Sequence, residues 1–129
     1  MNADLGLLIL RLGAGGMMLT HGWPKLQKVL HGDWKFADPI GIGAPATLVL
    51  AVFAELVCSA LVVVGYKTKL AALPVLATMA VAVGIVHRAD PFGDKEPAAL
   101  FGVAFLAIAL LGGGRFALDS RFGLKKKRK

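Results

Sequence analysis

The chain has 129 residues, 57% of them apolar before its 16 glycines are counted, and 18% charged. Soluble domains reach only about 45–50% apolar with glycine included. So little polar surface cannot cover a water-soluble domain, and the mean hydropathy of +0.69 indicates a membrane protein. The single cysteine excludes a disulfide framework.

Four apolar runs follow one another along the chain, each close to the length of about 20 residues that a helix needs to cross a bilayer core. The runs lack the alternation of barrel strands, so we expect helices. The sequence therefore predicts an all-α membrane protein, a four-transmembrane-helix bundle. Its helices are expected at approximately residues 5–30, 45–66, 70–87 and 97–113 of a domain covering residues 1–124, with a basic cytoplasmic tail at residues 125–129.

The connections between these helices are marked by glycine, proline and charge. They fall at residues 31–45, 65–69 and 87–96, and Pro97 is expected in the first turn of the last helix. The first run has no basic residues before it and carries Arg11 inside it, so we interpret it as a retained helix and not as a cleaved signal peptide.

The distribution of lysine and arginine predicts the orientation. With four spans, nine bases lie on the face of the termini: Lys67, Lys69, Arg115, Arg121 and the five of the tail. The opposite face has five bases, Lys25, Lys28, Lys35, Arg88 and Lys95, offset by five acids. We therefore expect both termini in the cytoplasm, in a multi-pass protein of the bacterial inner membrane. Nucleic-acid binding is not expected, because the basic tail has no interleaved aromatic residues.

Two ionisable residues fall inside the apolar runs, Arg11 and Glu55. A charge in mid-bilayer costs about 2.5–3.5 kcal/mol on insertion scales and needs a partner or a water-filled cavity. A rise of 1.5 Å per residue places Arg11 about 9 Å and Glu55 about 16 Å from the inner ends of their helices. The simplest prediction is an Arg11–Glu55 ion pair, which is either a structural tie between two helices or part of a polar site.

A second polar group is predicted near the outer side. His21 and His87 fall at one depth, Glu96 enters the last helix from the same side, and Trp23 lies in that layer, where an interfacial aromatic belt also explains it. Arg11, Met18, His21 and Lys25 follow one stripe of the first helix, which we expect to face the interior. The candidate ligand-binding residues are Arg11, Met18, His21, Trp23, Glu55, His87 and Glu96. No metal site is predicted, because the histidines lack ligand spacing.

Several segments resemble the DoxX family of small bacterial membrane proteins. The resemblance rests on Leu10-Arg11, the glycines at residues 13–16, residues 20–26 (THGWPKL), Ala54-Glu55, residues 64–72 (VGYKTKLAA), residues 79–82 (MAVA), Glu96 and residues 112–119 (GGGRFALD). The segments extend over nearly the whole chain, and the glycine run at residues 112–114 and the KKKRK tail depart from the pattern.

The resemblance implies a role in quinone-linked oxidoreduction, because DoxX and DoxD proteins are associated with thiosulfate:quinone oxidoreduction and quinol oxidation. The chain has no haem, flavin or iron–sulfur motif, so a partner would supply the electrons. We expect a subunit of a quinone-dependent oxidoreductase, with quinone or another small hydrophobic ligand in contact with the candidate residues. The alternatives are a non-catalytic membrane anchor or assembly factor for a redox complex, and a small-molecule or ion pathway. Expected partners are membrane lipid and either another protein or a second copy of the chain.

Overall fold

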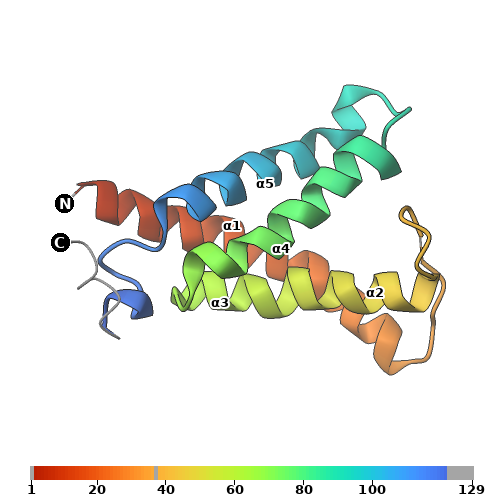
Figure 1. The fold of residues 1–129 in the computed structure, drawn as a ribbon, viewed down its shortest axis with the longest axis horizontal. Coiled ribbons are helices and arrows are strands. Elements are labelled where there is room, and N and C mark those ends of the chain that lie inside the picture. The colour runs from red at the N-terminus through yellow and green to blue at the C-terminus, as the bar shows by residue number, and fades with distance from the viewer. Residues whose placement is uncertain (1, 37, 122–129) are drawn as a thin grey trace.

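The computed structural model describes residues 2–36 and 38–121, and Figure 1 shows its helices. Every regular element in this described part of the chain is helical, and none is a strand. The basic tail expected at residues 125–129 lies outside the described residues. The prediction of an all-α protein is therefore confirmed for the part that the structure describes.

The first two helical segments form an antiparallel hairpin. Helix α1 covers Asn2–Leu30. The returning segment is continuous and consists of α2 (Ala44–Val52), the π-helical turn η1 (Phe53–Cys58) and α3 (Ser59–Val64). The two arms come close because α1 has Gly22 where it crosses η1. A Cβ atom on Gly22 would lie 2.8 Å from the carbonyl carbon of Glu55, so only glycine allows this separation.

The second pair consists of α4 (Thr68–Val81), its π-helical continuation η2 (Ala82–Val86) and α5 (Phe92–Leu111). A short 3₁₀ turn, η3 (Leu118–Ser120), follows. Helix α4 packs along α5, and Figure 1 shows α2 diverging from this pair at the end where α4 and α5 are connected.

Helix α5 begins earlier than residue 97, the start that the sequence predicts. Pro91 occupies the N-cap position and Phe92 is the first helical residue. The polar residues Asp94, Lys95 and Glu96 therefore belong to the helix, and Pro97 lies inside it. The expected start was wrong because it followed the edge of the apolar run, whereas a helix can continue through a charged turn into water.

The core joins the two pairs. Met18 of α1, Cys58 of η1 and Val62 of α3 meet Met79 of α4 and Phe105 of α5, and all five side chains are buried. This packing lies on the side where α3, α4 and α1 converge. The opposite ends of α2 and α5 have no such common core.

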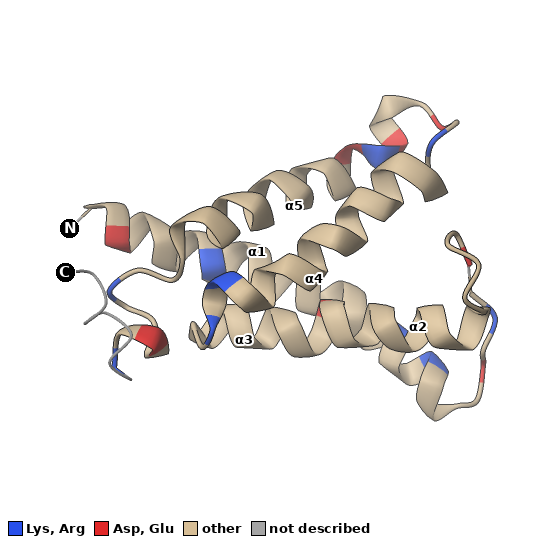
Figure 2. Cartoon of the chain, viewed as in Figure 1, with Lys and Arg blue, Asp and Glu red and all other residues tan. Residues whose placement is uncertain are grey.

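Three of the described helical segments are long and apolar enough to cross a membrane: residues 2–30, 44–64 and 68–86. Charged residues gather toward the two ends of the bundle, and much of the length between is free of them (Figure 2). Helix α5 has 20 residues but carries three charged residues near its start. The molecule is thus a membrane protein with several apolar helices. A fourth span and cytoplasmic termini stay predictions.

Candidate functional site

A cleft of about 540 Å³ lies between α2 and the α4–α5 pair. Its walls are mainly apolar, and its polar atoms come from a few side chains on different elements. The lining residues are Met18, His21, Lys25, Phe36, Pro39, Ile40, Ile42, Thr47, Leu50, Ala51, Glu55, Ala77, Thr78, Met79, Val81, Ala82, Val86, His87, Asp94, Pro97, Ala98 and Phe101. Small-molecule sites commonly combine apolar walls with a few placed polar groups in this way.

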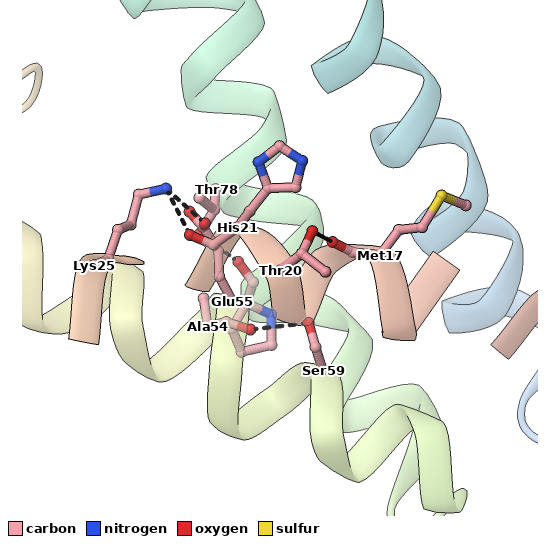
Figure 3. A network of polar contacts seen from close by, with 9 residues as sticks. Met17, Thr20, His21, Lys25, Ala54, Glu55, Ser59 and Thr78 are labelled. Carbon is pink, nitrogen blue, oxygen red and sulfur yellow. Dashed lines mark hydrogen bonds and ion pairs between the residues drawn. The ribbon is translucent and has the colours of Figure 1, made fainter. Parts of the chain in front are cut away.

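A partly buried ion pair lies on one wall of the cleft. Lys25 Nζ donates a hydrogen bond of 2.8 Å to Glu55 Oε1, and the side chains are 23% and 5% exposed, respectively. The same ammonium group lies 3.3 Å from the main-chain oxygen of His21 (Figure 3). An ammonium group has three donors, so one N–H of Lys25 is left for a group inside the cleft.

The π-helical turn η1 places Glu55 in this pair. In Phe53–Cys58 the helix is wider than an α-helix, and Ser59 Oγ donates to the carbonyl oxygen of Ala54 at 3.5 Å. Such turns are rare and frequently occur at functional sites. Gly22 packs against the main chain of Glu55, so Lys25, one turn further along α1, is within reach of the carboxylate.

His21 lies beside the ion pair and lines the cleft. Its ring meets the ring of Phe101 edge-on, with 5.5 Å between the centroids. Within the described part of the chain, the ring nitrogens of His21 have no hydrogen-bond partner. The imidazole N–H is therefore available to donate a hydrogen bond to a ligand oxygen in the cleft.

His87 lies at the outer part of the cleft, directly after the second π-helical turn, η2. Its Nδ1 is 2.8 Å from Asp90 Oδ2. A histidine held by a carboxylate at Nδ1 keeps its other nitrogen, Nε2, for a second partner. Both π-helical turns therefore belong to the walls of one cleft.

The predicted Arg11–Glu55 ion pair is wrong. Arg11 is buried, but its guanidinium group donates to four main-chain oxygens, those of Val62 (3.2 Å), Val63 (2.8 Å), Gly113 (3.1 Å) and Phe116 (3.0 Å). Eleven residues of α1 separate Arg11 from Gly22, which is about 16 Å along the helix axis. Arg11 therefore lies beside the C-terminal end of α3, where carbonyl groups lack helical donors and the helix dipole favours a cation.

The structure brings four of the seven candidate residues together at the cleft: Met18, His21, Glu55 and His87. Arg11, Trp23 and Glu96 do not line it. Trp23 is 54% exposed on α1, as expected of an interfacial aromatic residue. Glu96 is exposed near the start of α5, where Asp94 and Pro97 contribute to the cleft instead.

Sequence reasoning missed Lys25 as the partner of Glu55, although Lys25 was on the predicted stripe of α1. It also missed the loop that precedes α2, whose Phe36, Ile40 and Ile42 line the cleft. Asp38 holds this loop by accepting hydrogen bonds from the main chain of Ile42 and Gly43 and from the hydroxyl of Thr47. The sequence signal for this loop was an aspartate directly before a segment rich in proline and glycine, residues 39–45, because aspartate side chains commonly accept hydrogen bonds from the main chain of a turn.

Near the start of the same loop, the carboxylate of Asp33 is held by a hydrogen bond from Lys28 and by the main-chain N–H of Lys35, and these contacts lower its pKa. Among the residues that the structure describes, no three histidine, cysteine, aspartate or glutamate side chains are grouped to hold a metal ion. The polar side chains of the cleft are one ammonium group, two carboxylates, two imidazoles and two threonine hydroxyls.

These features define a helical membrane protein with a mainly apolar cleft that contains a partly buried ion pair. The sequence profile of the DoxX family matches residues 6–88, and the chain belongs to this family. The matched segment contains Lys25, Glu55, His21 and His87 and ends before α5. No curated protein and no solved structure matches the chain.

Proposed function

We propose that this DoxX protein binds a quinone in the cleft and acts as the quinone-binding subunit of a redox complex. The observation that carries the proposal is the Lys25–Glu55 pair, because it places one unused ammonium N–H and a neighbouring imidazole on the wall of an otherwise apolar cleft. A quinone ring is apolar with oxygen atoms that accept hydrogen bonds, so it matches both properties of the walls.

The size and position of the cleft support the same ligand. A volume of about 540 Å³ falls within the range of about 300–1,000 Å³ that is usual for small-molecule sites. Leu50 of α2 and Val86 of η2 are half exposed at its edge, so an apolar tail attached to the ring can continue between them toward lipid.

Reduction of a quinone to a quinol consumes two electrons and two protons. In our proposal a partner protein supplies the electrons, and the chain orients the ring and holds protons near its oxygen atoms. The donors that we assign to the ring are the ammonium group of Lys25, within the ion pair, and the imidazole of His21 beside it. His87 is bound to Asp90, which is exposed, and we assign this pair the exchange of protons with the outside.

Direct binding tests the proposal. The probe is a benzoquinone with a short alkyl tail, titrated calorimetrically into the protein in lipid nanodiscs, with empty nanodiscs as the blank. We expect His21→Phe to keep the ring contact with Phe101 but to raise Kd about twofold to tenfold, as the loss of one hydrogen bond does. His31→Phe is the matched control, because His31 directly follows the same helix and does not line the cleft.

Two results would reject the proposal. One is equal affinity of the parent and the folded His21→Phe protein for the quinone. The other is equal affinity for an alkylbenzene with the same tail but no oxygen atoms, which would reduce the cleft to an apolar groove. A protein that co-purifies with a soluble enzyme but binds no quinone would favour the membrane anchor, and ion or solute flux in liposomes would favour a pathway.

The topology that goes with this role is four spans with both termini in the cytoplasm of a bacterial cell, supported by the count of nine bases against five. A cysteine introduced at Arg121 should be protected from an impermeant thiol reagent in intact cells, whereas one at His31 should be labelled. Labelling of position 121 in intact cells would reverse the orientation. The native Cys58 is buried and provides the background control.

A further inference from the structure

A second hollow, of about 570 Å³, lies at the opposite end of the bundle from the mouth of the cleft. It is formed where the segment after α5 folds back beside the end of α3. Its lining combines two arginines with apolar side chains: Val64, Arg115, Phe116, Ala117, Leu118, Ser120 and Arg121. Both arginines are exposed, and Val64, Phe116 and Leu118 are exposed apolar residues beside them.

The acidic residues at this end do not neutralise the two arginines. Asp119 accepts hydrogen bonds from the main-chain N–H groups of Lys67 and Thr68 and from the Thr68 hydroxyl. Asp4 accepts one from the main-chain N–H of Arg115. Within the described residues, the side chains of Arg115 and Arg121 therefore form no ion pair, because the nearby carboxylates hold the backbone.

The backbone of the hollow is fixed independently of any ligand. Arg11 donates to the carbonyl oxygen of Phe116, and the hydroxyl of Ser120 bonds to the carbonyl oxygens of Arg115 and Ala117. The main-chain N–H of Asp119 donates to the oxygen of Gly65 at 2.9 Å. Such a scaffold presents Arg115 and Arg121 beyond the C-terminal ends of α3 and α5, where the apolar segments stop.

We propose that this hollow binds the headgroup of an anionic phospholipid. Its phosphate would lie between Arg115 and Arg121, since guanidinium groups bind phosphate oxygens through paired N–H donors. The first part of an acyl chain would lie against Phe116, Leu118 and Val64. This site is separate from the cleft, and its existence does not depend on quinone binding.

The test uses the full chain in mild detergent, titrated with phosphatidylglycerol or phosphatidylcholine and followed by native mass spectrometry. A base near a membrane surface contributes about 1 kcal/mol toward anionic lipid, which is about fivefold in affinity. We therefore expect Arg115→Gln and Arg121→Gln each to weaken phosphatidylglycerol binding about fivefold and the double variant about 25-fold. Phosphatidylcholine binding should not change.

Three controls separate the explanations. Arg88→Gln removes an exposed arginine at the other end of the bundle and should leave phosphatidylglycerol binding unchanged. A variant whose five tail bases are replaced by glutamine should keep the dependence on Arg115 and Arg121. Inorganic phosphate should not displace the lipid, because it cannot use the apolar wall.

The proposal is overturned if the double variant binds phosphatidylglycerol like the parent, or if neutralising the tail alone abolishes the preference. Displacement by inorganic phosphate at the concentration of the lipid would also overturn it, because the hollow would then be a simple anion site.

Discussion

Replacing Arg11 by leucine should destabilise the protein at the end of the bundle that lies away from the cleft. The guanidinium group holds four main-chain oxygens that come from two distant segments, the end of α3 and the loop after α5. Leucine removes every donor while keeping an apolar body of smaller size. The carbonyl groups then lose this donor, and within the described part of the chain only the oxygen of Val62 keeps another, the main-chain N–H of Gly65.

The magnitude follows from which of these oxygens water can reach. The hydrogen bonds to Val62 and Gly113 are buried, and those to Val63 and Phe116 are partly buried. The Val62 oxygen also accepts a hydrogen bond from the main-chain N–H of Gly65, so Gly113 provides the buried acceptor that loses its partner, at a cost of about 1–3 kcal/mol. The lost hydrogen bond to Val62 adds about 0.5–1.5 kcal/mol, so we expect a loss of about 1.5–4.5 kcal/mol. Arg11→Lys keeps the charge but loses the planar fork, so it should fall between the parent and Arg11→Leu.

The assay is equilibrium unfolding in detergent, followed by circular dichroism, for Arg11→Leu, Glu55→Gln and the double variant. The losses from the two sites should add, because Arg11 and Glu55 share no contact and additivity holds to about 0.3–0.5 kcal/mol for such sites. A stability of Arg11→Leu within about 0.5 kcal/mol of the parent would refute the calculation. A coupling energy of more than 1 kcal/mol between Arg11→Leu and Glu55→Gln would support the Arg11–Glu55 ion pair that the sequence predicted.

Three further outcomes are expected from the same unfolding assay. Breaking a buried ion pair costs about 3–5 kcal/mol, and because Lys25 is partly exposed we expect Lys25→Met to lose about 2–3 kcal/mol of stability. Adding Glu55→Gln to this variant should recover at least about 1 kcal/mol. Strictly additive losses from the two substitutions would contradict the ion pair. Gly22→Ala should cost about 1–3 kcal/mol of stability, because the added methyl group would push α1 and η1 apart. Gly16→Ala is the control, and because Gly16 has open space around it this change should be neutral or stabilising. Equal effects of the two substitutions would contradict the close approach of α1 to η1. Asp119→Ala should cost about 1–2 kcal/mol by uncapping α4, and unchanged hydrogen-exchange protection at the start of α4 would argue against it.

The helical class and the approximate spans could be predicted from the sequence, because both rest on the length and apolarity of the runs. The turn at residues 65–69 was predictable for a similar reason, since Gly65 has a positive φ of 81° where the chain reverses. The start of α5 was not, because the apolar run begins after the helix does. Composition marks the edge of the apolar layer and not the end of a helix.

The partners of the two intramembrane charges could not be predicted in the same way. The sequence prediction estimated the depth of each residue from a rise of 1.5 Å per residue, counted from the inner end of its helix. It compared only residues inside the apolar runs and did not include the length of their side chains. Long side chains instead reach along the helix. Lys25, assigned to the outer surface, extends back to Glu55, and Arg11 extends to main-chain oxygens that no sequence pattern displays as a site.

The π-helical turns were also hidden. A soluble helix reveals its inward face by apolar periodicity, but a helix in lipid is apolar on nearly every side, so an extra residue in one turn leaves no trace in the pattern. The turn at Phe53–Cys58 nevertheless changes which side chains face the cleft on either side of it. The position of Glu55 relative to α3 therefore depends on geometry that the sequence does not express.

The surroundings of Arg11 and of the Lys25–Glu55 pair distinguish a structural charge from a functional one. Arg11 is enclosed by main-chain oxygens, contacts no cleft, and ties α1 to α3 and to the loop after α5. The Lys25–Glu55 pair lies on a cleft wall, and one ammonium N–H remains for a ligand. Desolvation makes a buried ion pair a poor source of stability, so stability alone does not explain why this pair lies in the membrane-spanning part of the chain. Together with the two π-helical turns in the same walls, this placement makes the cleft, and not the arginine, the part of the molecule to test for activity.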